Sequence, residues 1–386
     1  MENPKVEIVE IVNWTATSGC DRPILSFRLL DFSNFKFADP APAATPFSSG
    51  GMGYNPRLMA VRSYLGLIRK YGALDFSKIA VERLLRQLTG GAVSAFFCER
   101  AMQNGYVYFG EHLGARQGVL QRHFFMYRLA CDEVRRSESH PFQVLEVGSY
   151  AGASAITWAL AIKTRDDRTG QVLCVDPWRN YLSEEDVETS ATPDVLRDMA
   201  QALESGQVFT LFDHNVRAAQ VADIVQPLRG RFADVAPSTA PDSCDIVYID
   251  ANHKYPDVMA DLQCAAQLVR PGAILCGDDL EVQWPFLDKE FCGSRTSYDL
   301  VVDPRSKQFV HPGVSKAVWD FFGTRVSEWN GFWAMRKKAD GAWEEVTLNA
   351  RFRHSQIPPH LKWWRTKTRF GLALPPQPQV PPFSNE

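Results

Sequence analysis

Four short runs of this chain are almost entirely apolar and rich in β-branched residues, and each carries an acid at or next to its C-terminal end. They are FQVLEV (142–147), QVLCVD (171–176), CDIVYID (244–250) and AILCGDD (273–279). Such runs lack the alternation of a half-exposed strand and are typical of parallel strands buried on both faces. We therefore expect an α/β fold built on a doubly wound, mostly parallel sheet.

The segments around these runs have the spacing of amphipathic helices. In 209–219, apolar side chains recur three and four positions apart. Further helices are predicted over 115–136, 153–162, 195–203 and 258–269. Strands that alternate with helices indicate a sheet with helices on both faces. Beyond Gly313 we expect one more helix and then a hairpin across Asp340 and Gly341.

Composition narrows the class of protein. The chain has 386 residues, with 42 Lys and Arg against 45 Asp and Glu, which excludes the strongly basic face of a dedicated nucleic-acid binder. The longest uncharged apolar stretch, 151–162, is shorter than the roughly 20 residues that span a bilayer. The N-terminus lacks the pattern of a secretory signal. We predict a cytoplasmic protein without a membrane span, and whether it forms a homo-oligomer stays open.

The residue pattern along the chain predicts three parts of the protein. Residues 1–110 contain strand-like stretches, a linker rich in Pro, Ala, Ser and Gly, and helical segments. We interpret them as a mixed and helical N-terminal extension that serves substrate choice or assembly. Residues 111–348 hold the alternating strands and helices of the main domain. Residues 349–386 form a C-terminal tail with a Pro-rich end that we expect to be disordered.

The first two strand ends form a candidate cofactor site, because ligands of open α/β sheets bind beyond the carboxyl ends of the strands. Glu146 lies in EVGSYAGAS, where Gly148 and Gly152 open a turn before a helix N-terminus. The spacing is G-x-x-x-G rather than the G-x-G-x-x-G of dinucleotide sites. It favours a ligand with a cationic head and no pyrophosphate. Asp176 suits two ribose hydroxyls, with helix capping as the alternative.

Trp178, His311 and the cysteines are interpreted from their positions in the sequence. Trp178 follows Asp176 by two positions, and we expect its ring to stack on an adenine. His311 has no partner pattern in the sequence and is predicted to be a surface or core histidine. The eight cysteines include no C-x-x-C pair, which predicts buried free thiols rather than a zinc site.

The third and fourth strand ends carry a second acidic group. Asp250 and His253 share the loop DANHKY, and the next strand ends in the doublet Asp278 and Asp279. Carboxylates on adjacent strand ends make a hard-oxygen site suited to Mg²⁺. His253, with an ordinary pKa near 6.5, is the natural nearby base. Each motif alone is more often a loop hydrogen-bond pair or a solvated turn, but together they favour function.

Several motifs in this order resemble the class I S-adenosylmethionine-dependent methyltransferases, especially the bacterial group that includes macrocin-type sugar O-methyltransferases. They are EVGSYAGAS, CVDPW, DIVYIDANHKYPDVMADL, LVRPGAILCGDDL and HPGVSKAVWDFFG. The resemblance covers about residues 115–340. It implies a Rossmann-like sheet of seven strands whose final strand is antiparallel.

The resemblance also implies a role for each matching residue. The cofactor turn falls on Glu146, Gly148, Tyr150 and Gly152, and the ribose acid on Asp176. The metal ligands match Asp250 and Asp279, with Asp278 as a neighbouring candidate, and the catalytic base matches His253, with Asp250 beside it.

The sequence therefore predicts an S-adenosylmethionine-dependent O-methyltransferase that is assisted by Mg²⁺ and acts on a hydroxyl of a sugar, a glycoconjugate or a natural product. Two alternatives stay open. One is an NAD-dependent oxidoreductase on a Rossmann-like fold, and the other is a non-catalytic adaptor that keeps the cofactor pocket.

Overall fold

The computed structural model describes residues 91–115, 120–137, 141–164, 169–352, 356–358 and 360–361. The predicted strands, linker and first helices of the N-terminal extension and the Pro-rich tail lie outside these residues.

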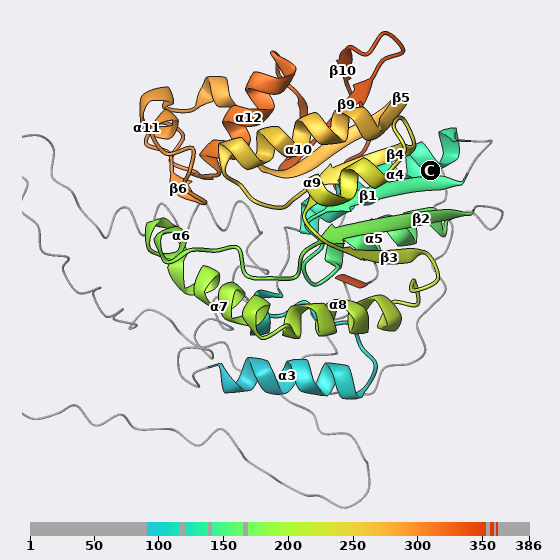
Figure 1. The fold of residues 1–386 in the computed structure, drawn as a ribbon, viewed down its shortest axis with the longest axis vertical. Helices are drawn as coiled ribbons and strands as arrows, with labels where there is room; N and C mark the ends of the chain where they lie inside the picture. The colour runs from blue at the N-terminus through green and yellow to red at the C-terminus, as the bar shows by residue number, and fades with distance from the viewer. Residues whose placement is uncertain are drawn as a thin grey trace, which may run out of the picture. The chain divides into compact units, whose positions relative to one another are not determined.

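A mostly parallel sheet occupies the centre of the described residues (Figure 1). Its order is β10-β9-β5-β4-β1-β2-β3, and β8 also pairs with β9. The five neighbouring strands β3, β2, β1, β4 and β5 are parallel, whereas β9 runs antiparallel to β5. The strands are β1 (Phe142–Val147), β2 (Gly170–Asp176), β3 (Val225–Arg229), β4 (Cys244–Ile249), β5 (Val269–Leu280), β8 (Ser327–Trp329), β9 (Gly331–Lys337) and β10 (Trp343–Glu345).

The predicted fold class is confirmed, and each of the four apolar runs forms a parallel strand. The sheet of the described residues has eight strands rather than seven. Six strands, from β3 at one edge to β9, form the body of the sheet, and β8 and β10 each add a three-residue pairing to β9, which gives eight. The predicted hairpin is the β9–β10 connection, which turns at Asp340 and Gly341.

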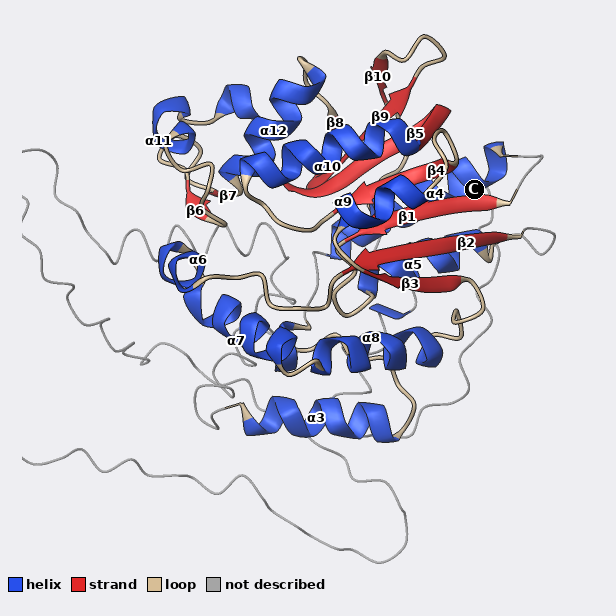
Figure 2. Ribbon diagram, in the orientation of Figure 1, coloured by secondary structure: helices blue, strands red, loops and turns tan. Residues whose placement is uncertain are grey.

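Helices cover both faces of the sheet (Figure 2). The longer ones are α3 (Ala92–Gln103), α4 (Leu120–Arg136), α5 (Ala153–Ile162), α7 (Pro193–Glu204), α8 (Gln207–Ala218), α10 (Tyr255–Leu268) and α12 (Pro312–Phe322). Short helices are η2 (His112–Gly114), α6 (Glu184–Thr189), α9 (Phe232–Val235), η3 (Ala236–Ser238), η4 (Trp284–Phe286) and α11 (Lys289–Gly293). A separate two-stranded sheet pairs β6 (Val301–Val302) with β7 (Phe309–Val310).

Successive side chains of the strands enter opposite halves of the core, as the period of a β-strand requires. In β1, Val144 packs in the cluster that contains Trp158 of α5, whereas Leu145 packs in the cluster that contains Leu262 of α10. Both β1 side chains are completely buried. A strand that is apolar on both sides therefore buries both sides, which explains the continuous apolar runs. The cysteines among the described residues are free, and all but Cys264 are buried.

Candidate active site

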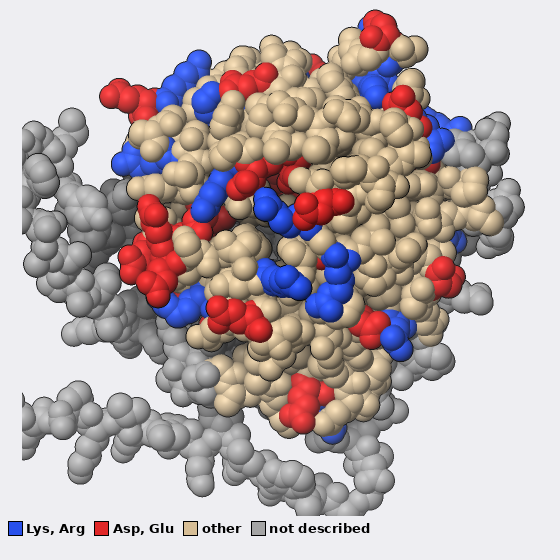
Figure 3. All heavy atoms as spheres, in the orientation of Figure 1, with Lys and Arg blue, Asp and Glu red and all other residues tan. Residues whose placement is uncertain are grey.

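A cavity of about 950 Å³ lies at the carboxyl ends of the parallel strands. Its walls include Gly148 after β1, Asp176 at the end of β2, Asp250 after β4 and Asp279 at the end of β5. Figure 3 shows acidic and basic side chains around a hollow on this face of the described residues. The sheet topology thus brings together four strand ends that are up to 131 positions apart in the sequence (279 − 148 = 131).

The turn after β1 needs a glycine for two reasons. Gly148 has φ +88°, a backbone conformation that other residues rarely adopt, and a Cβ there would collide with the carbonyl group of Asp250. The β1 and β4 ends therefore approach backbone to backbone. Gly152 also has a positive φ, but it caps α5 and its Cβ position faces Phe212 rather than the cavity.

Glu146 is completely buried beneath this turn. Its Oε1 accepts a hydrogen bond from Ser154 Oγ at 2.7 Å, whereas Oε2 is buried without a hydrogen-bond partner among the described residues. Burial raises the pKa of Glu146 to about 8. An acid that is fully desolvated and half unsatisfied is suited to a cationic ligand group.

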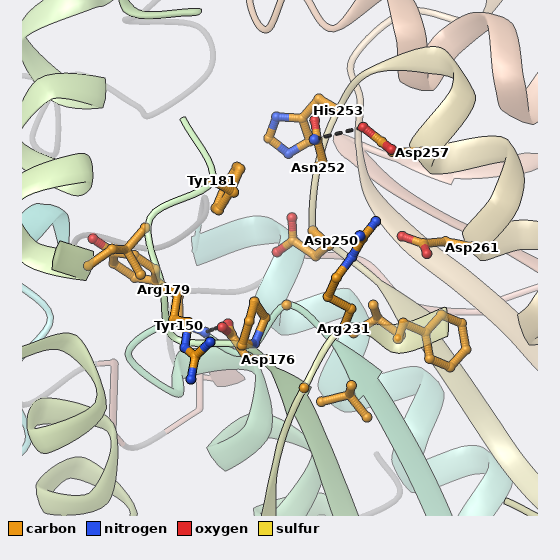
Figure 4. Close-up of a pocket in the computed structure, with 18 of the residues that line it drawn as sticks. Tyr150, Asp176, Arg179, Tyr181, Arg231, Asp250, Asn252, His253, Asp257 and Asp261 are labelled. Carbon is orange, nitrogen blue, oxygen red and sulfur yellow. Dashed lines mark hydrogen bonds between the residues drawn. The ribbon is translucent and has the colours of Figure 1, made fainter. Parts of the chain in front are cut away.

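Asp176 connects the turns that follow β1 and β2. Its Oδ2 accepts from the backbone N–H of Tyr150 at 2.9 Å, and its Oδ1 accepts from the backbone N–H of Trp178 at 2.6 Å. Burial raises the pKa of Asp176, although these hydrogen bonds oppose the rise. Tyr150 lines the cavity next to Asp176 (Figure 4) and donates its hydroxyl proton to Leu113 O at 2.6 Å.

The predicted stacking of Trp178 on an adenine was wrong. The ring is only 2% exposed and packs against Phe209 and Phe212, with centroid distances of 4.9 Å to each. Its Nε1 donates to Tyr150 O at 2.8 Å. The backbone of Trp178 has a positive φ of 44°, and its indole belongs to the core behind the cavity wall.

His253 lies between two carboxylates. Its Nδ1 is 2.6 Å from Asp299 Oδ1, and its Nε2 is 3.1 Å from Asp279 Oδ2. Burial lowers the pKa of His253, but the two carboxylates outweigh this effect and raise it well above the usual value. The arrangement stabilises the imidazolium form.

Asp250 is the second titratable group of this region that faces the cavity (Figure 4). Its Oδ2 accepts from the Tyr248 hydroxyl at 3.0 Å. Burial, together with repulsion from Asp278 and Asp279, raises the pKa of Asp250 to about 8. A carboxyl group with such a pKa can exchange a proton near neutral pH.

The acid doublet is held by an arginine from α4. Arg122 Nη1 is 2.7 Å from Asp278 Oδ1 and 2.6 Å from Asp279 Oδ1. Its Nη2 is 2.9 Å from Glu281 Oε1. Burial raises the pKa of Asp279, but the nearby His311 and Arg122 outweigh it and hold that pKa well below the usual value.

The structure brings all of the predicted strand-end acids and His253 to one end of the sheet, and it adds three residues that the sequence did not indicate: Arg122, Asp299 and His311. His311, predicted to be a surface or core histidine, is buried, and its Nδ1 is 3.1 Å from Glu281 Oε2 while its ring lies 4.5 Å from that of His253. A signal was present in the sequence, because His311 opens the HPGVSKAVWDFFG motif. Arg122 and Asp299 lie in segments without any motif.

Comparison with family models matches residues 145–280 to the methyltransferase domain. This segment runs from β1 to the end of β5 and contains both acidic strand-end groups. Residues 145–280 therefore match a methyltransferase domain.

Solved structures with a similar fold include three bacterial proteins. A putative O-methyltransferase from Klebsiella pneumoniae is 18% identical, with 67% of this chain and 97% of that chain covered and a TM-score of 0.38. TomG, an O-methyltransferase of tomaymycin synthesis from Streptomyces achromogenes, was solved with S-adenosylmethionine and is 18% identical, with 66% and 94% covered and a TM-score of 0.34. An O-methyltransferase from Bacillus cereus, in complex with S-adenosylhomocysteine, is 16% identical, with 66% and 94% covered and a TM-score of 0.34. Curated protein sequences give no match.

The residues present fit S-adenosylmethionine, because Gly148 lines the cavity without a side chain and Glu146 Oε2 is buried without a hydrogen-bond partner among the described residues. Neither alternative, the NAD-dependent oxidoreductase or the non-catalytic adaptor, is favoured by the domain match. In the part of the chain that the structure describes, no helix combines the length and apolar character needed to cross a bilayer.

Proposed function

We propose that this protein transfers the methyl group of S-adenosylmethionine to a hydroxyl group of a sugar, a glycoconjugate or another natural product. One observation carries the proposal. His253, whose Nδ1 lies 2.6 Å from Asp299 Oδ1, stands at the wall of the same cavity as the glycine turn of Gly148 and the acid Asp176. A proton acceptor and a nucleotide-type cofactor turn thus share one space.

Three residues are suited to hold the cofactor. Glu146 would take the ammonium group of its amino acid part, because the carboxylate is buried with Oε2 unsatisfied. Gly148 lines the cavity without a side chain, and Asp176 would accept the ribose hydroxyls with the lone pairs that its two backbone hydrogen bonds leave over. The cofactor supplies the electrophilic methyl carbon.

The chain's own residues would align the acceptor and remove its proton. The acceptor oxygen forms a bond to the methyl carbon as the carbon–sulfur bond breaks, and the bonding pair stays on sulfur, which becomes a neutral thioether. The hydroxyl proton passes to the neutral form of His253, which the two carboxylates make the minor form and also the stronger base. Asp279 and Asp299 stabilise the resulting imidazolium, in the way that a carboxylate orients and supports a catalytic histidine. Asp250, with a pKa of about 8, is a second group that can take the proton.

The size of the cavity supports a small-molecule acceptor. Ligand pockets of proteins commonly have volumes of roughly 300–1,000 Å³, and this cavity of about 950 Å³ is at the upper end. It can hold the cofactor and a second molecule beside it. Most of the catalytic effect then comes from holding oxygen, carbon and sulfur in line.

Calorimetry and an acceptor screen test this proposal. We expect S-adenosylhomocysteine to bind to the purified chain and NAD to give no heat. Incubation with S-adenosylmethionine and a library of sugars, glycoconjugates and phenolic natural products should yield a product that has gained one methyl group on oxygen, identified by mass spectrometry and NMR. A folded protein that binds neither S-adenosylmethionine nor S-adenosylhomocysteine would contradict the proposal, and so would methylation confined to nitrogen or carbon.

A further inference from the structure

Arg122 is one of the most deeply buried charges of the described residues, with a side chain only 3% exposed. Its side chain extends from α4 into the site, where its nitrogens contact four polar groups. Its Nε donates to Asn330 O at 2.7 Å, Nη2 to Glu281 Oε1 at 2.9 Å, and Nη1 to Asp279 Oδ1 at 2.6 Å, with Asp278 Oδ1 at 2.7 Å. A guanidinium with this many charged partners is held in one orientation.

The backbone opposite makes room for this guanidinium. Gly331 has φ +97°, and a Cβ there would collide with Arg122 Nη2. The loop before β9 therefore combines a glycine that leaves the space with the Asn330 carbonyl that accepts from Nε. Two independent features of this loop are thus fitted to the arginine.

The position of Nη1 conflicts with a bridging divalent ion. An ion shared by Asp278 and Asp279 would have to lie about 2.0–2.1 Å from an oxygen of each carboxylate if it were Mg²⁺, and Nη1 already occupies the space between these oxygens. The remaining oxygen of Asp279, Oδ2, faces His253 Nε2 at 3.1 Å.

Among the described residues, the three side chains whose ligand atoms lie within 4.8 Å of one another are His253, Asp279 and His311. The set Asp250, Asp278 and Asp279 is not gathered in this way. Nitrogens of the two histidines face Asp299 and Glu281 at hydrogen-bond distance. The residues present therefore do not fit the predicted Mg²⁺ site.

We propose that Arg122 is the resident cation of this active site and replaces a divalent metal ion at the Asp278–Asp279 doublet. The carboxylates of the buried Asp278 and the half-buried Asp279 repel one another and need a positive partner to stay ionised. Arg122 supplies that charge permanently, since a guanidinium does not lose its proton in proteins. It also fixes Asp279 against His253, which makes it a positioning residue for the methyl transfer proposed above, on which this inference rests.

Arg122 lies outside residues 145–280, the segment that matches the methyltransferase domain. That segment supplies the acids, and α4 supplies their counter-charge. Removing the guanidinium should therefore leave two adjacent carboxylates with an open space between them, which is the kind of oxygen site that Mn²⁺ and Mg²⁺ prefer.

Mn²⁺ titration followed by electron paramagnetic resonance tests the inference without needing an acceptor. Full-length wild-type protein, loaded with S-adenosylhomocysteine, should leave the free Mn²⁺ signal at its buffer level. Arg122→Ala should bind one equivalent, and the double variant Arg122→Ala with Asp279→Asn should lose it. Arg135→Ala is the matched control, because Arg135 is an exposed arginine on the same helix that pairs with Asp132; it should behave as wild type.

Two results would overturn the inference. One is stoichiometric Mn²⁺ binding by the wild type that Asp279→Asn abolishes, and the other is a folded Arg122→Ala variant that binds no Mn²⁺. If Arg122→Ala does not fold, the wild-type titration still decides, together with Arg122→Lys, which should keep Mn²⁺ out. Binding of S-adenosylhomocysteine, measured in the same samples, reports separately on the proposed function.

Discussion

Nδ1 of His253 lies 2.6 Å from Oδ1 of Asp299, although the two residues are 46 positions apart. Asp299 precedes β6, in a segment that follows the last parallel strand and carries no motif. The carboxylate fixes the orientation of the imidazole ring and directs Nε2 towards Asp279. In the proposed mechanism, the histidine that accepts the proton is therefore positioned by a residue outside the methyltransferase domain match.

His253→Ala should reduce kcat about 10²- to 10⁴-fold, the usual contribution of a general base, and leave the Kd for S-adenosylhomocysteine unchanged. Asp299→Asn should reduce kcat less, about 10- to 100-fold, because the ring would remain but lose its orientation. The measurement is steady-state turnover on the acceptor found in the screen, with calorimetry for cofactor binding. His214→Gln is the control, since His214 contacts Tyr106 O away from the cavity. Equal turnover of wild type and His253→Ala would remove His253 from the mechanism.

Gly148→Ala should abolish cofactor binding and lower the free energy of unfolding. The positive φ alone costs about 1–3 kcal/mol for a residue with a Cβ, and the collision with the Asp250 carbonyl adds to it. Gly206→Ala separates the two effects, because Gly206 also has a positive φ, +69°, but open space around its Cβ position. We expect urea unfolding to show a loss in both variants, larger in Gly148→Ala. Similar losses, with cofactor binding retained, would contradict the close approach of the β1 and β4 ends.

Binding of S-adenosylmethionine near pH 7 should release protons from Glu146. Burial raises the pKa of this carboxyl group to about 8, so about 0.9 proton is bound at pH 7 in the free protein. A cationic ammonium group beside it would lower that pKa and expel the proton. Calorimetry in buffers of different ionisation enthalpy measures the number released. Glu146→Gln should remove the buffer dependence, and a wild type without any buffer dependence would argue against this placement of the ammonium group.

Stability should fall at acidic pH in part because of His360. Burial lowers the pKa of His360 to about 3, with the nearby His123 as the second cause. A histidine with a folded-state pKa below its unfolded value near 6.5 stabilises the fold above pH 6.5 and loses this contribution as the pH falls towards 3. The free energy of unfolding should decrease by up to about 1.4 kcal/mol per pH unit in this window.

Urea unfolding at a series of pH values compares wild type with His360→Gln, which cannot be protonated. We expect a shallower acid slope for the variant, whatever its absolute stability, because the carboxylates contribute equally to both proteins. Parallel slopes between pH 6 and pH 4 would show that His360 does not titrate in the unfolding reaction.

The sequence alone determined the sheet and the location of the site. Strands that are buried on both faces are apolar at nearly every position. The runs at 142–147 and 244–250 therefore predict parallel strands without any knowledge of the fold. An acid that ends such a run lies at the rim of the sheet, where ligands bind, and this placed Asp176, Asp250 and Asp279 around one cavity. Local periodicity carries this information because it reports burial on each face of one element.

The tertiary structure decided which side chains touch within the site. Trp178 follows a cofactor-type acid in the sequence, yet its indole turns into the core against Phe209 and Phe212. Arg122 is 157 positions from Asp279, and its charge reaches the doublet only because α4 packs beside β9. Contacts of this kind depend on how elements pack against one another. The residue pattern of a single helix or strand does not indicate which distant residue it will contact.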